Sequence, residues 1–203
     1  VSSNNQTKVS GTTIFVYFDG NHQHLREQVR EGIAAVYLNT MLFGANIQEI
    51  VQNAVMLNLP NWFKEGLVAY AGQTWNVERD NELRNILLSR RYKRFERFAD
   101  DFPRLAGQSM WYFISEKYGR PAVSNLLYLT RINRSVESGF LYVMDQSFQS
   151  VVQEWEQFYR SRYESDIKGR QIPQSTQTVT LKKRKEQLPL THLKLSPDGN
   201  KVV

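Results

Sequence analysis

The first part of the chain combines a short strand pattern with a long helical one. Residues 13–18 are β-branched or aromatic and are closed by Asp19 and Gly20, which predicts one strand followed by a turn. From residue 22 to residue 43 apolar residues recur at helical spacing, and Gly44 suits the position after the helix. The positions that carry this helical pattern are Leu25, Val29, Ile33, Val36 and Tyr37.

The rest of the pattern is helical. An apolar helix is predicted over residues 47–57 and another over residues 62–70, whose apolar face holds Trp62, Phe63, Leu67 and Tyr70. Residues 80–98 predict one charged helix with Leu83, Ile86 and Leu87 facing inward. Four further helices are predicted over residues 106–118, 121–129, 135–144 and 148–163. The expected fold class is mainly α with a small β element (α+β).

Changes of composition divide the chain into four segments. Residues 1–12 are predicted to form a polar N-terminal arm, and residues 13–168 one domain. Residues 169–190 turn to Gln, Ser, Thr and Pro, which is typical of a linker or extended arm. Residues 191–203 alternate apolar positions around a Ser-Pro-Asp-Gly turn, as a β-hairpin does. We expect the chain to be a piece of a longer protein.

Composition narrows the possible partners. The chain has 203 residues, 41% of them hydrophobic, which is enough for a sizeable core. Its net charge is +6, but the basic residues accompany no nucleic-acid-binding motif, so no nucleic-acid partner is expected. The chain contains no run of roughly 18 apolar residues, so no membrane span is predicted. The lack of cysteine excludes disulfides and thiolate metal sites.

Two motifs carry a resemblance to a known family. The first is the spacing of Pro60, Trp62, Glu65, Gly66, Leu67 and Tyr70. It resembles the helix that supplies the third zinc ligand in gluzincin-type, peptidase-MA-like metallopeptidases, with Glu65 as that ligand. The second motif stands where such an enzyme has His-Glu-x-x-His, but here residues 26–30 read Arg-Glu-Gln-Val-Arg. Guanidinium groups stay protonated and offer zinc no lone pair.

The resemblance covers roughly residues 13–165, because residues 108–119 and 148–155 are also similar to the helical tail of these domains. It implies the helical half of a thermolysin-like fold without metal or other cofactor and without catalysis. Arg26, Glu27, Arg30 and Glu65 then mark the relic of the zinc site. We expect Arg26 or Arg30 to pair with Glu65, and Trp62, Tyr70 and Trp111 to line the old substrate cleft.

The end of the chain carries a second resemblance. Residues 193–203 are similar to the Leu-Ser-Pro-Asp-Gly signature of TolB-like (WD40-like) β-propeller blades. This resemblance implies the periplasm or outer envelope of a Gram-negative bacterium. The expected function is therefore a non-catalytic module that binds a protein, a peptide or another envelope component, or that serves as a scaffold beside a propeller.

Three alternatives stay open. Residues 26–30 can be an ordinary charged turn of an exposed helix, stabilised only by pairs along that helix. His22 and His24 can belong to a rearranged metal site, which makes the domain a residual metallopeptidase. The domain can also be purely architectural, with its cleft filled by Trp62, Trp75 or Trp111.

Overall fold

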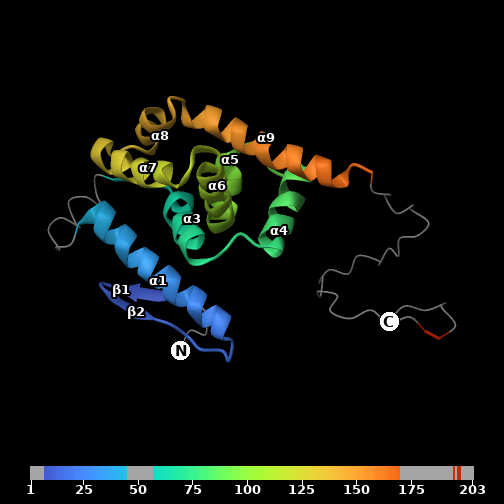
Figure 1. The fold of residues 1–203 in the computed structure, drawn as a ribbon, viewed down its shortest axis with the longest axis horizontal. Helices are drawn as coiled ribbons and strands as arrows, with labels where there is room; N and C mark the ends of the chain where they lie inside the picture. Colours follow the sequence, from blue (N-terminus) through green and yellow to red (C-terminus); the bar gives the residue numbers. More distant parts are fainter. Residues whose placement is uncertain (1–6, 45–56, 170–193, 195, 198–203) are drawn as a thin grey trace. The chain divides into compact units, whose positions relative to one another are not determined.

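The structure is a computed structural model of the chain, and it describes residues 7–44, 57–169, 194, 196 and 197. These residues are mainly helical, with one small two-stranded sheet, as the sequence predicts (Figure 1). The chain divides into two units, Val1–Ile167 and Lys168–Val203. Most of the predicted linker and of the propeller-like hairpin lies outside the described residues.

The sheet is a hairpin of β1 (Lys8–Ser10) and β2 (Thr13–Phe15), paired antiparallel with Val9 opposite Ile14. The first strand lies within the range that we expected to be a polar arm, and the second is shorter than predicted. Beyond Phe15 the backbone is held by a side chain. The amide of Gln28 accepts a hydrogen bond from the N–H of Tyr17 and donates one to its carbonyl, both at 2.8 Å.

Helix α1 (His22–Phe43) has the predicted ends. Asn21 caps its N-terminus by accepting hydrogen bonds from the N–H groups of Gln23 and His24, which have no acceptor within the helix. At the other end Gly44 takes a positive φ of 97°, a conformation that favours glycine. The helix predicted over residues 47–57 falls almost entirely on residues 45–56, which lie outside the described residues.

Helices α3 (Asn61–Gly72) and α6 (Pro103–Tyr118) cross at the centre of the domain, where two glycines meet. A Cβ on Gly66 would lie 2.2 Å from the Cα of Gly107. Next to this crossing the indole N–H of Trp111 donates to the carbonyl of Phe63 at 3.0 Å. The crossing therefore depends on backbone-to-backbone contact that only glycine permits.

The helix predicted over residues 80–98 is wrong as a single element. The structure has α4 (Val77–Leu88) and α5 (Phe95–Asp101), separated by a short connection in which Arg90 has a φ of 51°. No glycine or proline marks this break in the sequence. Leu83, Ile86 and Leu87 are buried as predicted.

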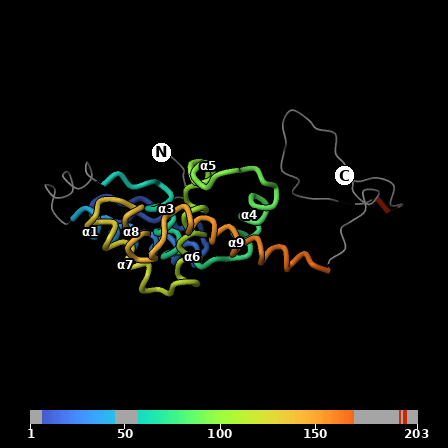
Figure 2. The backbone as a smooth tube through the Cα atoms, turned by 90° about the horizontal axis from the view of Figure 1, so that it is seen from above, coloured from blue at the N-terminus to red at the C-terminus, as the bar shows by residue number. Residues whose placement is uncertain are grey.

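The last three helices of the first unit are α7 (Arg120–Asn133), α8 (Val136–Met144) and α9 (Phe148–Ile167). Helix α9 runs past α6 towards α4 (Figures 1 and 2). Aromatic rings from several helices fill the core between them, and the rings of Trp62 and Phe148 stack 5.4 Å apart. None of the described helices is long and apolar enough to cross a bilayer.

Candidate functional site

A cleft of about 970 Å³ opens beside the N-terminal half of α1. Side chains from the hairpin region, α1, α3, α4 and α6 form its wall. The lining residues are Thr7, Asp19, Asn21, Gln23, His24, Glu27, Gln28, Glu31, Glu65, Gln73, Asn76, Val77, Glu78, Arg79 and Arg104. Of these residues only Val77 is aliphatic and none is Phe, Tyr or Trp, so the cleft offers polar and charged groups rather than an apolar surface.

Helices α1 and α3 approach each other closely beside the cleft. At the end of α3, a Cβ on Gly72 would lie 2.2 Å from the Cγ of Glu31. The Glu31 side chain therefore fits at this position because residue 72 has no side chain. Residues after Gly72, including Asn76 and Glu78, line the cleft together with the first turns of α1. The two helices thus run in opposite directions past each other (Figure 1).

The wall of the cleft carries an excess of negative charge. Its carboxylates are Asp19, Glu27, Glu31, Glu65 and Glu78, against the guanidinium groups of Arg79 and Arg104. Arg79 is engaged elsewhere, because it pairs with Glu82 at 3.2 Å. An acidic cleft stands out in a chain whose net charge is +6.

Glu31 and Arg104 form an ion pair at the base of this wall. Glu31 is buried, with 9% of its surface exposed, whereas the Arg104 side chain keeps 35% exposed. Burial raises the pKa of Glu31 above its usual range, and the opposing attraction of Arg104 does not compensate fully. Burial of the Glu31 carboxylate therefore costs solvation free energy, which the attraction of Arg104 offsets only in part.

A second pair of charged side chains, His24 and Asp19, lies in the cleft wall near the hairpin. Nδ1 of His24 lies 2.9 Å from a carboxylate oxygen of Asp19. This hydrogen bond raises the pKa of His24 and lowers the pKa of Asp19. Asp19 also accepts a hydrogen bond from the backbone N–H of Asn21, so its carboxylate already has two partners within the cleft wall.

Within the described part of the chain, the remaining carboxylates of the cleft form no ion pair, although Glu27 and Glu78 help to raise the pKa of His24 through longer-range attraction. Glu27 accepts one hydrogen bond, from the amide of Gln23 at 3.1 Å. Among the residues that the structure describes, Glu65 and Glu78 have neither an ion pair nor a side-chain hydrogen bond. Glu27, Glu65 and Glu78 are therefore available to a positively charged group from outside the domain.

The structure corrects half of the predicted relic site. Glu27 and Glu65 line the same cleft, but Arg26 and Arg30 do not, and both are exposed on another side of α1. Neither arginine forms an ion pair with Glu65 within the described part of the chain, so the predicted bridge is wrong. The reason is helical phase: the cleft lies on the side of Gln23, Glu27 and Glu31.

The predicted aromatic lining is also corrected. Trp62 and Trp111 are buried in the core and line no part of the cleft, and Tyr70 packs, half-buried, against the same core. Trp75 stacks on Tyr112 at 5.7 Å. These rings hold helices together, and they do not fill the cleft as the architectural alternative supposed.

The two histidines of α1 occupy different environments. His24 lines the cleft, whereas His22 is exposed and lies against Phe18, with ring centroids 5.1 Å apart. In the described parts of the chain, no three His, Asp or Glu side chains converge closely enough to hold a metal ion. The described residues therefore offer no three-ligand set of the kind that an active gluzincin has.

The sequence analysis assigned no role to most of the cleft residues, and three of them show why. Glu31 has a weak signal, since it lies one helical turn after Glu27 on the same face. Gln28 stood inside the relic motif without an assigned role, and it fixes the hairpin to α1. Arg104 has no local signal, because only the packing of α6 brings it to Glu31.

Comparisons of this chain with models of known protein families, with curated proteins and with solved structures find no match.

The position of the arginines gives a first prediction. Because Arg26 and Arg30 lie outside the cleft, an Arg26→His/Arg30→His variant is expected to gain no zinc site. Elemental analysis after dialysis against zinc measures this directly. One zinc per chain in the variant, absent from the parent, would show that α1 presents these two positions to Glu65.

Proposed function

We propose that residues 13–168 form a non-catalytic, peptidase-like domain that binds a basic segment of a peptide or protein in the cleft. In this proposal the domain belongs to a cell-envelope protein that carries a TolB-like propeller, in the periplasm or outer envelope of a Gram-negative bacterium. The family, the propeller and the location rest on the sequence motifs. The binding function rests on the cleft.

The single observation that carries the proposal is the charge of the cleft wall. Glu27, Glu65 and Glu78 face one cavity without an ion pair among the described residues, and Arg104 is already occupied by Glu31. A lysine or arginine side chain that enters such a cavity exchanges water for several carboxylates. Its attraction is strengthened by partial exclusion of solvent.

The absence of catalysis is part of the proposal and follows from the donor groups. The gluzincin mechanism requires two imidazole ligands one helical turn apart. The resemblance places guanidinium groups at both positions, and these cannot bind a metal. The residual metallopeptidase is the alternative, and it requires His24 as a ligand in place of its bond to Asp19.

The test uses two labelled octapeptides, one alternating Lys with Gly and one alternating Glu with Gly. Fluorescence anisotropy at low salt is expected to show binding of the lysine peptide at least about tenfold tighter, a difference of roughly 1.4 kcal/mol. A Glu27→Lys/Glu65→Lys variant is expected to lose this preference. Added salt should weaken the binding, since charges at an open cleft are screened.

The control variant carries the same change of net charge elsewhere. Glu116 and Glu164 are exposed on α6 and α9 and line no part of the cleft. A Glu116→Lys/Glu164→Lys variant should therefore bind the lysine peptide nearly as well as the parent. Equal losses in the two variants would mean that only the overall charge matters, and the cleft would not be the binding site.

A further inference from the structure

One face of α1 carries a stripe of exposed residues with Ile33 and Tyr37 at its centre. We call Arg26, Arg30, Ile33, Tyr37 and Thr40 the outer stripe. Their spacing of four, three, four and three residues places them along one side of the helix. Ile33 is 44% exposed and Tyr37 is 73% exposed, although a stripe with this period is typical of a helix face packed against a partner.

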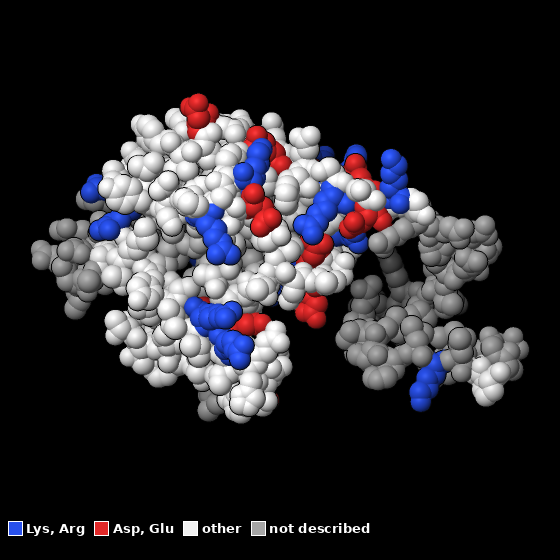
Figure 3. All heavy atoms as spheres, viewed as in Figure 1, with Lys and Arg blue, Asp and Glu red and all other residues white. Residues whose placement is uncertain are grey.

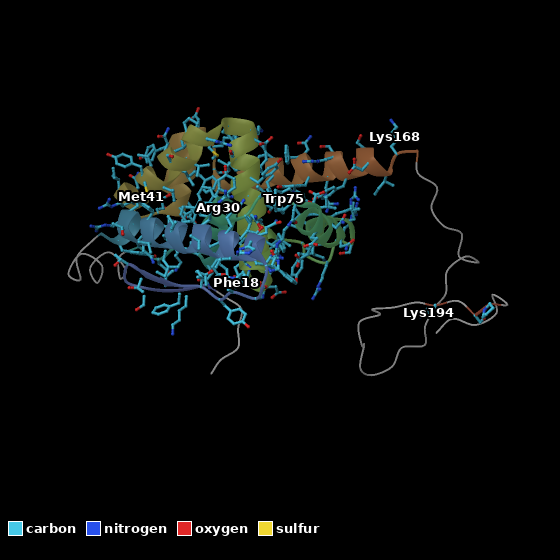
Figure 4. The ribbon with its side chains drawn as sticks, turned by 60° about the horizontal axis from the view of Figure 1, so that its bottom comes forward. Phe18, Arg30, Met41, Trp75, Lys168 and Lys194 are labelled. Carbon is cyan, nitrogen blue, oxygen red and sulfur yellow. The ribbon has the colours of Figure 1, made fainter. Side chains whose placement is uncertain are left out.

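A second exposed apolar segment begins at the end of β2. Phe15, Val16, Tyr17 and Phe18 are four consecutive large apolar residues, each between 41% and 55% exposed. The two hydrogen bonds between Tyr17 and Gln28 hold this segment against α1 (Figure 4). With roughly 200 Å² for a free aromatic side chain, these four residues with Val29, Ile33 and Tyr37 leave on the order of 600 Å² exposed in total, of which one face holds only a part because successive side chains of an extended segment point to opposite sides. A standard protein interface buries roughly 800 Å² on each partner.

The charges of α1 are sorted between its two sides. Both carboxylates of the helix, Glu27 and Glu31, line the cleft, whereas its arginines lie on the outer stripe. Figure 3 shows the basic side chains over α1 with acidic atoms directly beside them and uncharged surface around. Within the described residues neither arginine has an ion-pair partner. Aromatic residues and arginine without carboxylates are the composition of protein interface cores.

The outer stripes of two chains are complementary when their α1 helices run antiparallel. Its N-terminal half is cationic, Ile33 stands at the middle, and its C-terminal half presents Tyr37 and Thr40. Two antiparallel copies centred on Ile33 place Arg30 against the partner's Tyr37, where a guanidinium can lie over the aromatic ring. Arg30 and the partner's Arg30 are then separated along the axis by about 9 Å, from a rise of 1.5 Å per residue.

We propose that two copies of this chain form a twofold dimer in which their α1 helices pack antiparallel, with Ile33 near the axis and the hairpin residues extending the contact. Twofold, self-complementary contacts are the commonest in soluble homo-oligomers. A parallel pairing would instead set arginine against arginine. This inference concerns residues of α1 that do not line the cleft, and it does not depend on what the cleft binds.

The chain has no cysteine, which makes a single introduced cysteine an unambiguous reporter. Facing residues near the axis of two packed helices come within disulfide distance. An Ile33→Cys variant of the full chain is therefore expected to form a covalent dimer rapidly under mild oxidation. An Asn39→Cys variant is the control, because Asn39 is exposed on α1 away from the outer stripe.

Sedimentation equilibrium of the unmodified chain completes the test. The expected result is a concentration-dependent dimer, with a dissociation constant that rises at least about tenfold in an Ile33→Asp/Tyr37→Asp variant. Circular dichroism checks that this variant is folded. A monomer at all concentrations, or equal cross-linking of the Ile33→Cys and Asn39→Cys variants, would overturn the proposal and leave this face to a different partner.

Discussion

A Gly107→Ala substitution is expected to destabilise the domain by more than about 3 kcal/mol, or to prevent folding. An added Cβ at this position would lie 1.9 Å from the carbonyl oxygen of Trp62 and 2.6 Å from the Cα of Gly66. Both obstacles are backbone atoms, so relief requires α3 and α6 to move apart. In an exposed helix the same substitution stabilises by about 1 kcal/mol, which makes the sign of the effect diagnostic.

Urea unfolding followed by circular dichroism measures this change. Gly32→Ala is the comparison, because the added methyl group there meets only side-chain atoms of Ile14, with Cγ2 at 2.2 Å, so relief requires the small hairpin to shift and not two core helices to separate. We expect a much smaller loss of unfolding free energy in this variant. If Gly107→Ala unfolds at the same urea concentration as the parent, then the two helices do not cross at the distance described.

The second large effect concerns Arg104. An Arg104→Met variant leaves Glu31 as a buried carboxylate without its partner. Breaking a fully buried pair costs about 3–5 kcal/mol, and we expect a loss near the lower end of that range because Arg104 keeps 35% of its side chain exposed. Glu31→Gln is expected to cost far less, because Arg104 remains partly exposed and the amide oxygen still accepts its hydrogen bond. A Glu31→Gln/Arg104→Met variant should recover much of the stability that Arg104→Met loses. Thermal or urea unfolding at pH 7 measures all three.

The pH dependence of the same variants tests the charge at Glu31. Because its pKa is raised in the folded protein, the folded state binds this proton more tightly than the unfolded chain does. This contribution to stability is complete below the unfolded pKa of about 4.3, and it is lost as the pH rises through the raised value. Arg104→Met should steepen this loss, and Glu31→Gln should abolish it. An unchanged pH profile in Glu31→Gln would contradict the assignment.

Local signals account for the parts of the fold that the sequence predicted. Asn21 and Gly44 bracket α1 with a side-chain cap and a positive φ, and both effects act within a few residues. The break between α4 and α5 has no such signal, because Arg90 takes a left-handed conformation that its residue type does not favour. Tertiary packing of Phe95 and Phe98 into the core decides that break.

The candidate site shows the limit of motif reasoning more sharply. The sequence indicated Glu27 and Glu65 as members of one cleft, and the structure brings them to one cavity. The sequence could not show which face of α1 turns towards the core. The spacing of Val29, Ile33 and Tyr37 predicts that these residues face inward, but all three are exposed. The observed rotation of α1 turns Arg26 and Arg30 outward and brings Glu31 to Arg104, a contact between residues 73 positions apart.

Native mass spectrometry of the chain mixed with the Lys-Gly octapeptide shows at once whether the cleft binds a basic peptide and whether it cleaves it. We expect a complex whose mass is that of the protein with one intact peptide per chain and no metal, and far less complex with the Glu-Gly octapeptide. Peptide fragments, or protein that retains one zinc ion per chain, would contradict the proposed function and favour the residual metallopeptidase. Equal binding of both peptides would refute the acidic cleft as the recognition site.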